Sequence, residues 1–92
     1  MRFEWDVEKA ALNVAKHRVS FEEAVEVFFD PNALDDYDPM HSQEEMRFFI
    51  IGLSSRRLLR VVYAERDADL LRIISARKAN KMERKVYEGR TN

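Results

Sequence analysis

Hydrophobic and polar positions in the first third of the chain predict a short strand followed by two helices. Residues Arg2–Trp5 alternate between polar and apolar side chains, as a half-buried strand does. Asp6 then stands where a helix N-cap belongs, and apolar residues recur at helical spacing over Val7–His17. A capping box that begins at Ser20 opens a second helix over Phe21–Phe29. This part of the chain is therefore predicted to be β-α-α.

The segment from about Asn32 to Gln43 shows no hydrophobic periodicity and is predicted to be a loop. Three aspartates stand within it, namely Asp35, Asp36 and Asp38. A loop of about a dozen residues is long for a compact domain, and such loops are often functional. The alternative is a solvated acidic loop that takes no part in the chemistry.

The second half of the chain predicts three strands and a last helix. Strands are expected over Met46–Leu53, Leu58–Glu65 and Leu70–Ser75, where apolar residues gather between turn residues. Connections as short as those between them make neighbouring strands antiparallel. A helix is expected over about Lys78–Glu88. The order β-α-α-β-β-β-α predicts an α+β domain in which helices pack on an antiparallel sheet.

Length and composition narrow the class of protein further. The 92 residues are expected to form one domain, residues 1–92, and 2 Gly and 2 Pro leave little linker. With 0 Cys, disulfides and thiolate metal sites are excluded. Apolar runs are far shorter than the ~20 residues of a membrane span, and the charged first residues do not resemble a signal peptide. We therefore expect a cytoplasmic protein without membrane contact.

Charge is distributed unevenly, although the net charge is only −1. Residues 1–45 carry 4 basic and 12 acidic side chains, whereas residues 72–92 carry 7 basic and 2 acidic ones. A chain divided in this way can present a positive face to a polyanion. The alternative is that the acidic helices simply pair with the basic C-terminal segment.

An arginine inside an apolar strand is the most informative chemical signal. Arg72 interrupts a run of leucines and isoleucines, and a buried guanidinium is costly unless it is paired or binds an anion. Arg77 and Lys78 follow at the predicted junction of strand and helix, where the free N–H groups of a helix N-terminus also favour an anion. The segment therefore predicts an anion site where the sheet meets the helix. The alternative for Arg72 is an ion pair with a carboxylate such as Glu45.

The sequence contains no recognisable motif for a metal site or a nucleotide-binding site. The two histidines, His17 and His41, are not part of an HExxH or other paired-ligand motif, and no glycine-rich phosphate loop is present. We therefore predict neither a metal nor a cofactor. Acid–base and electrostatic chemistry on an anion remains. RNA can be cleaved without a metal if a base takes the 2′-OH proton, cations stabilise the phosphorane and an acid protonates the 5′-oxygen.

Side chains that can supply these roles occur in several of the predicted elements. The candidate catalytic residues are Lys16, His17, Arg47, Arg72, Arg77 and Tyr87, and the candidate RNA-binding residues are Lys78, Lys81 and Arg84. Structural alternatives exist for several of them. His17 at a helix C-terminus can complete the helix dipole, Lys16 can be a solvated lysine, and the lysines of the last helix can form a wet face.

Four blocks of the sequence resemble the BrnT toxins of type II toxin–antitoxin modules, which are small relatives of the RelE-like ribonucleases. The blocks are Phe3–Asp6; Asn13 with Lys16–His17, Val19–Ala24 and Val27–Phe28; His41–Ser42 with Glu45, Arg47–Phe48 and Ile51–Gly52; and Arg72–Ala79 with Glu83 and Tyr87. One block alone is a weak signal. Four in this order, nearly from end to end, are specific.

The resemblance implies a RelE-like fold and an endoribonuclease that slows translation. It also implies a BrnA-like antitoxin with a ribbon-helix-helix part, through which the complex binds operator DNA. On this hypothesis Arg72 and Arg77 contact the scissile phosphate of the RNA and Arg47 assists. Lys16 or His17 acts as acid or base, and Tyr87 positions the substrate. The rival hypothesis is a non-catalytic RelE-like binding module that serves as an antitoxin-bound corepressor.

Two residues depart from the family pattern as the resemblance gives it. Arg18 stands where the family usually has glycine after Lys-His, so the end of the first helix is expected to differ. Met46 stands between Glu45 and Arg47, where the family often has a second glutamate. Any role of that glutamate in catalysis or antitoxin binding is therefore lost here.

Overall fold

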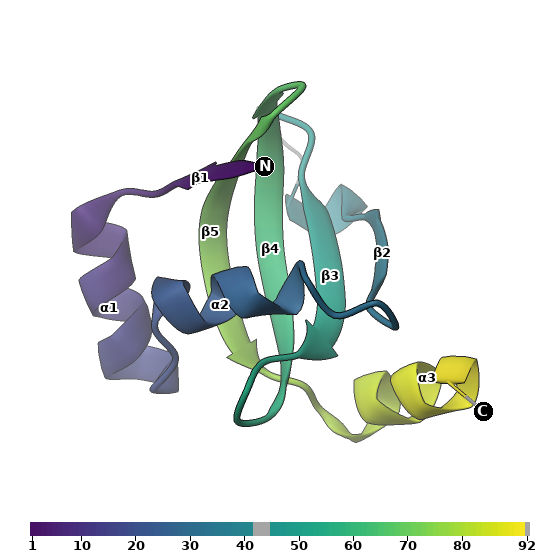
Figure 1. The fold of residues 1–92 in the computed structure, drawn as a ribbon. Coiled ribbons are helices and arrows are strands. Elements are labelled where there is room, and N and C mark those ends of the chain that lie inside the picture. Colours follow the sequence, from purple (N-terminus) through teal and green to yellow (C-terminus); the bar gives the residue numbers. More distant parts are fainter. Residues whose placement is uncertain (42–44, 92) are drawn as a thin grey trace.

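A computed structural model describes residues 1–41 and 45–91 of the chain, in which three helices lie around a five-stranded sheet (Figure 1). The elements in chain order are β1 (Arg2–Glu4), α1 (Val7–His17), α2 (Phe21–Val27), β2 (Leu34–Tyr37), the short 3-10 helix η1 (Pro39–His41), β3 (Phe48–Leu53), β4 (Leu58–Asp67), β5 (Leu70–Lys78) and α3 (Lys81–Thr91). The predicted α+β class is confirmed. Part of the predicted loop, residues 42–43, lies outside the described residues.

The sheet has the strand order β1-β5-β4-β3-β2 and is mixed. The pairs β2–β3, β3–β4 and β4–β5 are antiparallel, as predicted for the last three strands of the chain, but β1 pairs with β5 in parallel. The prediction of a wholly antiparallel sheet was therefore wrong at one edge. The long intervening chain leaves the direction of β1 open, because only short connections force antiparallel neighbours.

The prediction of a loop was wrong over Leu34–Tyr37, which form the edge strand β2. These residues pair with β3 from Leu34 opposite Ile51 to Tyr37 opposite Phe48. Their own sequence is acidic and lacks a clear alternation, so the strand depends on pairing with β3. Charged residues suit this position because they discourage further pairing at a sheet edge.

The two N-terminal helices begin as the sequence predicts. Asp6 accepts a hydrogen bond from the Lys9 N–H (3.0 Å), and Ser20 accepts one from the Glu23 N–H (3.0 Å). α1 has the predicted bounds, whereas α2 ends at Val27, two residues earlier than predicted. The carboxylate of Glu23 forms an ion pair with Arg57 (2.8 Å) and ties α2 to the turn between β3 and β4.

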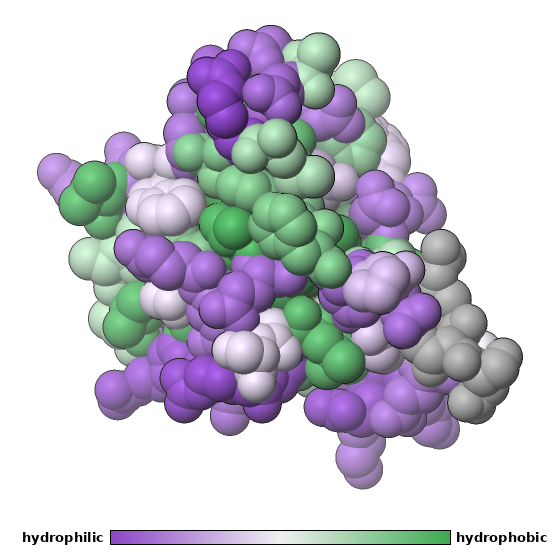
Figure 2. Space-filling model, in the orientation of Figure 1, coloured by the Kyte–Doolittle hydropathy of each residue, from purple (hydrophilic) through white to green (hydrophobic). Residues whose placement is uncertain are grey.

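The main core lies between α2 and the sheet. Its fully buried side chains come from α2, the segment before it and the central strands, and they include Val19, Phe21, Val27, Leu59, Val61 and Ile73. On the side of the molecule that carries α2, hydrophobic surface gathers near the centre of the view and hydrophilic surface surrounds it (Figure 2). Apolar packing is thus concentrated on the α2 side of the sheet.

A buried asparagine fixes α1 against the edge of β5. The Asn13 side chain donates to the Ala76 carbonyl (2.8 Å) and accepts from the Ala76 N–H (3.1 Å), in the manner of a neighbouring strand. It also donates to the Val19 carbonyl (2.9 Å). Because these bonds lie one helical turn before Lys16 and His17, they set where the end of α1 stands relative to β5.

The last helix begins at Lys81, three residues later than predicted, because β5 continues to Lys78. The pairing of β4 with β5 extends to Leu59 opposite Lys78, and the Ala79 N–H donates to the Leu58 carbonyl (3.0 Å). Figure 1 shows α3 beyond one end of the sheet, on the opposite side of the molecule from α1. A small second core of Ile51, Leu58 and Tyr87 holds it there.

Candidate functional site

Three of the predicted site residues line two neighbouring cavities beside α1 and β5. One cavity of about 210 Å³ is lined by Lys9, Leu12, Asn13, Lys16, His17, Ile74 and Ser75. A second cavity, of about 280 Å³, is lined by Glu4, Trp5, Asp6, Lys9, Arg72, Ile73 and Ile74. The two share Lys9 and Ile74, and we call them together the α1–β5 groove. Lys16 and His17 line the first of these cavities, and Arg72 lines the second.

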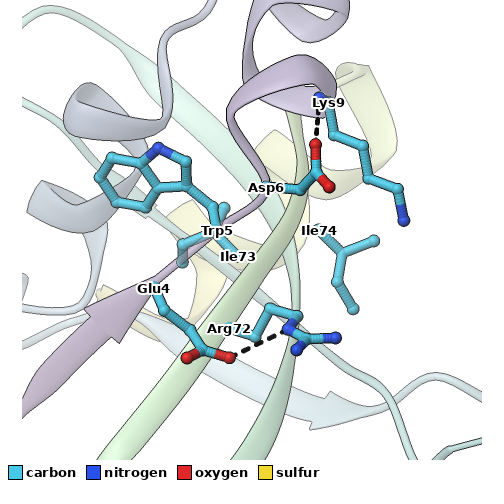
Figure 3. Close-up of a pocket in the computed structure, with 7 residues that line it drawn as sticks. All are labelled: Glu4, Trp5, Asp6, Lys9, Arg72, Ile73 and Ile74. Atoms are coloured by element: carbon cyan, nitrogen blue, oxygen red, sulfur yellow. Dashed lines mark hydrogen bonds and ion pairs between the residues drawn. The ribbon is translucent and has the colours of Figure 1, made fainter.

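Arg72 is paired with a carboxylate, but the partner is Glu4 and not Glu45. The Arg72 Nε lies 3.1 Å from the Glu4 Oε2, because the parallel register of β1 and β5 places the two residues opposite one another. In Figure 3 the side chains of Arg72 and Lys9 extend to the same side of β5 with Ile74 between them. The Arg72 side chain keeps 39% of its surface exposed, so this ion pair leaves the guanidinium accessible from the groove.

Arg47 belongs to the same chain of ion pairs as Arg72. It lies immediately before β3, and its Nη2 is 3.7 Å from the Glu45 Oε1. Arg66 bridges onward, at 3.3 Å from Glu45 and 3.8 Å from Glu4. Three arginines and two glutamates therefore alternate from the start of β3 to β5, and Arg47 is connected with Arg72 through carboxylates.

Arg77 lies in a second charged cluster on the sheet, which we call the sheet-face network and define as Asp38, Arg60, Arg77 and Glu83. Arg77 forms two hydrogen bonds with the Glu83 carboxylate (2.8 and 2.9 Å). The Arg60 Nε lies 3.3 Å from Glu83, and the Arg60 Nη2 lies 3.4 Å from Asp38. Arg60 and Arg77 stand directly opposite one another in the β4–β5 ladder. Glu83 thus joins two adjacent guanidinium groups.

The carboxylate of Glu83 occupies the place where the sequence predicted an anion. It accepts a hydrogen bond from the Asn80 N–H (2.9 Å), while Asn80 caps α3 by accepting from the Glu83 N–H (2.8 Å). Burial raises the pKa of Glu83, but the hydrogen bonds from Arg77 and Asn80 outweigh it and hold the pKa below its usual value. Glu83 is therefore ionised at neutral pH. The prediction that Arg77 and Lys78 stand at a helix N-terminus was wrong, because both are in β5.

Tyr87 anchors α3 and does not line the α1–β5 groove. Its side chain is buried, and its hydroxyl donates to the Asp30 Oδ2 at 2.6 Å. The same Asp30 oxygen accepts from the Leu53 N–H (2.7 Å). Burial, followed by the hydrogen bond to the Asp30 carboxylate, raises the pKa of Tyr87 to about 12. Its hydroxyl is thus engaged within the protein and fixes α3 to the segment after α2.

The three predicted RNA-binding residues are exposed, and they lie at the C-terminal end of β5 and in α3. Lys78 ends β5, and Lys81 and Arg84 are exposed on α3. Arg84 lies 3.7 Å from Glu88 on the same helix. These residues do not line the α1–β5 groove.

The two departures from the family pattern have different structural outcomes. Arg18 takes the left-handed conformation (φ 60°) that glycine adopts most easily, and its N–H donates to the Val14 carbonyl (2.9 Å). α1 therefore ends with a left-handed cap without the glycine. The Arg18 carbonyl accepts a hydrogen bond from the Arg57 side chain (2.8 Å). Met46 is exposed and brings no polar group to the ion pairs of Glu45 and Arg47.

Sequence reasoning missed Arg60, which lies at the centre of the sheet-face network. The segment Leu58–Val62 places an arginine between two leucines and two valines, the same pattern that drew attention to Arg72. The guanidinium carbon of Arg60 also lies 4.7 Å from the centre of the Phe49 ring, a cation–π distance. Applying the criterion of a cation in an apolar strand to both strands would have found it.

The described residues place no group of three or more His, Cys, Asp or Glu side chains close enough to hold a metal ion. In the same part of the chain, no helix is long and apolar enough to cross a membrane. The site therefore consists of cations and paired carboxylates on a mixed sheet. The molecule falls in the class of small α+β domains with a basic strand, β5, next to the short edge strand β1.

The chain belongs to the BrnT family of ribonuclease toxins of type II toxin–antitoxin systems, since the sequence profile of that family matches residues 5–83. Among solved structures, it is similar to the crystal structure of the Brucella abortus ribonuclease toxin BrnT. The TM-score is 0.66 at 25% sequence identity, and the alignment covers 88% of this chain and 99% of the other. A search of curated proteins found no significant match. The resemblance seen in the sequence is thereby confirmed.

Proposed function

We propose that this chain is a toxin that cleaves RNA without a metal ion, acting as one domain in the cytoplasm and thereby inhibiting translation. The observation that carries the proposal is the α1–β5 groove, in which the cavity lined by Lys16 and His17 adjoins the cavity lined by Arg72 through the shared residues Lys9 and Ile74. Metal-free cleavage needs an acid–base group next to cations, and this groove offers both kinds of side chain. Membership in a ribonuclease toxin family supports the same chemistry.

We assign a proposed role to each of the candidate catalytic residues. Arg72 and Arg77 lie on one strand and stabilise the negative charge that develops on the scissile phosphate. His17 or Lys16 transfers protons at the 2′-OH and the 5′-oxygen. Arg47 assists through the ion-pair chain that ends at Arg72.

The remaining candidates bind the RNA strand or hold α3 in place. Lys78, Lys81 and Arg84 bind the strand beyond the cleavage point, where neutralising phosphates makes affinity dependent on salt. Tyr87 contributes by holding α3 in place through Asp30.

The proposed partner is a BrnA-like antitoxin with a ribbon-helix-helix part. Membership in a type II toxin–antitoxin family supports a protein antitoxin. The acidic N-terminal half of the chain offers it a surface of opposite charge to the basic RNA-binding part. Operator DNA is contacted through the antitoxin in the complex.

Cleavage of a single-stranded RNA by the purified protein in EDTA tests the enzymatic proposal. We expect cleavage by the parent and a loss of about 100-fold in Arg72→Ala and in Arg77→Ala, as for removal of one donor to a developing oxyanion. Arg56→Ala is the matched control, because it removes an exposed arginine in the turn between β3 and β4. Undiminished cleavage by both Arg72→Ala and Arg77→Ala contradicts the assignment.

A second candidate function is a non-catalytic binding module that acts as an antitoxin-bound corepressor. The observation in its favour is that Arg72 and Arg77 each already bind a carboxylate of the protein. Induced expression in cells separates the two functions. A ribonuclease toxin arrests growth until the antitoxin is supplied, whereas a binding module leaves growth unchanged.

A further inference from the structure

Two arginines stand side by side in the middle of the sheet, held together by one carboxylate. Arg60 and Arg77 are directly opposite in the β4–β5 ladder, a position in which like charges repel. Glu83 relieves the repulsion, with two hydrogen bonds to Arg77 and an ion pair of 3.3 Å to Arg60. Asp38 holds the other side of Arg60. The arrangement is a guanidinium pair that has an anion bound between its members.

Stability alone gives little reason for such an arrangement. Replacing a buried ion network by apolar residues of similar size is often neutral or stabilising. The same strand carries apolar residues at Val62 and Ala64, both of them buried. Arg60 interrupts this apolar strand and keeps only 16% of its side chain exposed. A ligand that binds the two guanidinium groups accounts for their place in the sheet.

The geometry of the guanidinium group identifies the chemistry of that ligand. The planar fork of arginine binds a carboxylate through two parallel hydrogen bonds and binds a phosphate in the same way. Arg77 makes such a pair of bonds with Glu83. The carboxylate therefore stands where two oxygens of a phosphate would bind.

The helix that supplies Glu83 is attached to the sheet at few points. Its apolar contacts are made by Tyr87 together with Ala79 just before it, whereas Met82 and Val86 remain 69% and 50% exposed. The bond from Tyr87 to Asp30 lies one turn further along α3 than Glu83. The first turn can therefore move away from the arginines while Tyr87 keeps the helix attached.

We propose that Arg60 and Arg77 form a phosphate site for RNA, and that Glu83 occupies this site as an internal competitor until RNA displaces it. The inference rests on the proposed function, because RNA is the ligand. It adds Arg60 to the residues that contact the substrate, and it gives Glu83 a regulatory role. Binding of RNA is then an exchange of one anion for another on the same two guanidinium groups.

The test compares Glu83→Gln with Glu88→Gln for binding of a fully 2′-O-methylated oligoribonucleotide, which lacks the 2′-OH needed for cleavage. Glutamine keeps the acceptor oxygen for the Asn80 N–H, so the cap of α3 is retained while the charge is lost. Glu88→Gln removes the same charge from the same helix and also releases an arginine, Arg84, at an exposed position. Fluorescence anisotropy at two salt concentrations measures both affinities.

We expect Glu83→Gln to bind the oligonucleotide about 10-fold more tightly than the parent, and Glu88→Gln to change affinity by less than about 2-fold. Adding Arg60→Lys to Glu83→Gln should abolish the gain, because lysine keeps the charge but loses the fork. Equal affinities of the two glutamine variants, or weaker binding by Glu83→Gln, overturn the proposal and leave Glu83 as a structural bridge.

The outcome can be separated from that of the proposed function. If the parent cleaves RNA and Glu83→Gln gains no affinity over Glu88→Gln, the internal competitor is refuted while the ribonuclease stands. If Glu83→Gln gains affinity but no variant cleaves RNA, the phosphate site stands and the catalytic proposal fails. Hydrogen exchange adds a second readout, since displacement of Glu83 should speed exchange in the first turn of α3 when the oligonucleotide binds.

Discussion

Arg60 and Arg72 occupy almost the same sequence context but have different surroundings in the sheet. Each follows two leucines and precedes two β-branched residues. Arg60 is in β4, the central strand, where it contacts Asp38, Glu83 and the Phe49 ring. Arg72 is in β5, where Glu4 and a bordering cavity leave its side chain 39% exposed. The contrast teaches that strand position, and not local sequence, decides whether such a cation is enclosed or open to ligands.

The largest difference between the two arginines should appear in stability. We expect Arg60→Ala to lower the free energy of unfolding by about 3 kcal/mol, because it leaves Asp38 buried without this partner and removes one partner of Glu83. Arg72→Ala should cost less than about 1 kcal/mol, since its ion pair is solvent-exposed. Urea denaturation of both variants measures this. Equal losses would show that strand position does not separate them.

The next largest effect concerns Glu83, the carboxylate that contacts both Arg60 and Arg77, and the pH dependence of its contribution to stability. We expect Glu83→Gln to cost about 2 kcal/mol at neutral pH, as for loss of hydrogen bonds to a charged group. The pKa of Glu83 is lowered by folding, so its contribution is present above its unfolded pKa and is lost as the pH falls through its folded pKa. The stability difference between parent and variant should therefore shrink on acidification below about pH 4.5. A difference that stays constant down to pH 2 contradicts this assignment.

A smaller effect is expected at the anchor of the helix that carries Glu83. Tyr87→Phe removes the hydroxyl that donates to Asp30 and should cost about 1.5 kcal/mol of stability. Because this hydroxyl is outside the α1–β5 groove, the cleavage rate of the folded variant should stay within about 2-fold of the parent. A loss of catalytic rate without a loss of stability would instead assign Tyr87 a direct role at the substrate.

The smallest effect should come from the aromatic ring that Arg60 covers. A double-mutant cycle of Phe49→Leu and Arg60→Lys, followed by urea denaturation, isolates their coupling energy. We expect about 0.5 kcal/mol, in the range of a partly exposed cation–π contact. No coupling would mean that the carboxylates alone hold Arg60.

Local signals along the chain predicted those elements that local interactions stabilise. α1 has its predicted bounds because its cap and apolar positions are all encoded within Asp6–His17. β2 was missed because its strand conformation depends on pairing with β3, and strand formation is more context-dependent than helix formation. The start of α3 was placed too early because the pairing of β4 with β5 holds Arg77 and Lys78 in the strand.

The candidate site was predictable only in part, because local sequence signals do not identify partners from distant elements. The sequence indicated that Arg72 either pairs with a carboxylate or binds an anion, but Glu4 became its partner through the parallel register of β1. Likewise, Glu83 was visible as a residue of the C-terminal block, whereas its contact with Arg60 depends on where α3 begins. Contact partners that come from distant elements could be identified only from the three-dimensional arrangement.

The parallel pairing of β1 with β5 has a consequence for the timing of folding. Glu4 and Arg72 are 68 positions apart, so the edge strand cannot join the sheet until most of the chain has left the ribosome. Contacts of such long sequence separation also form slowly, because a large loop must close first. Arg72 therefore acquires its partner, and the α1–β5 groove its wall at Glu4, among the last events of folding. The α1–β5 groove is therefore complete only after β5, which is near the C-terminal end of the chain, has been synthesised and has paired with β1.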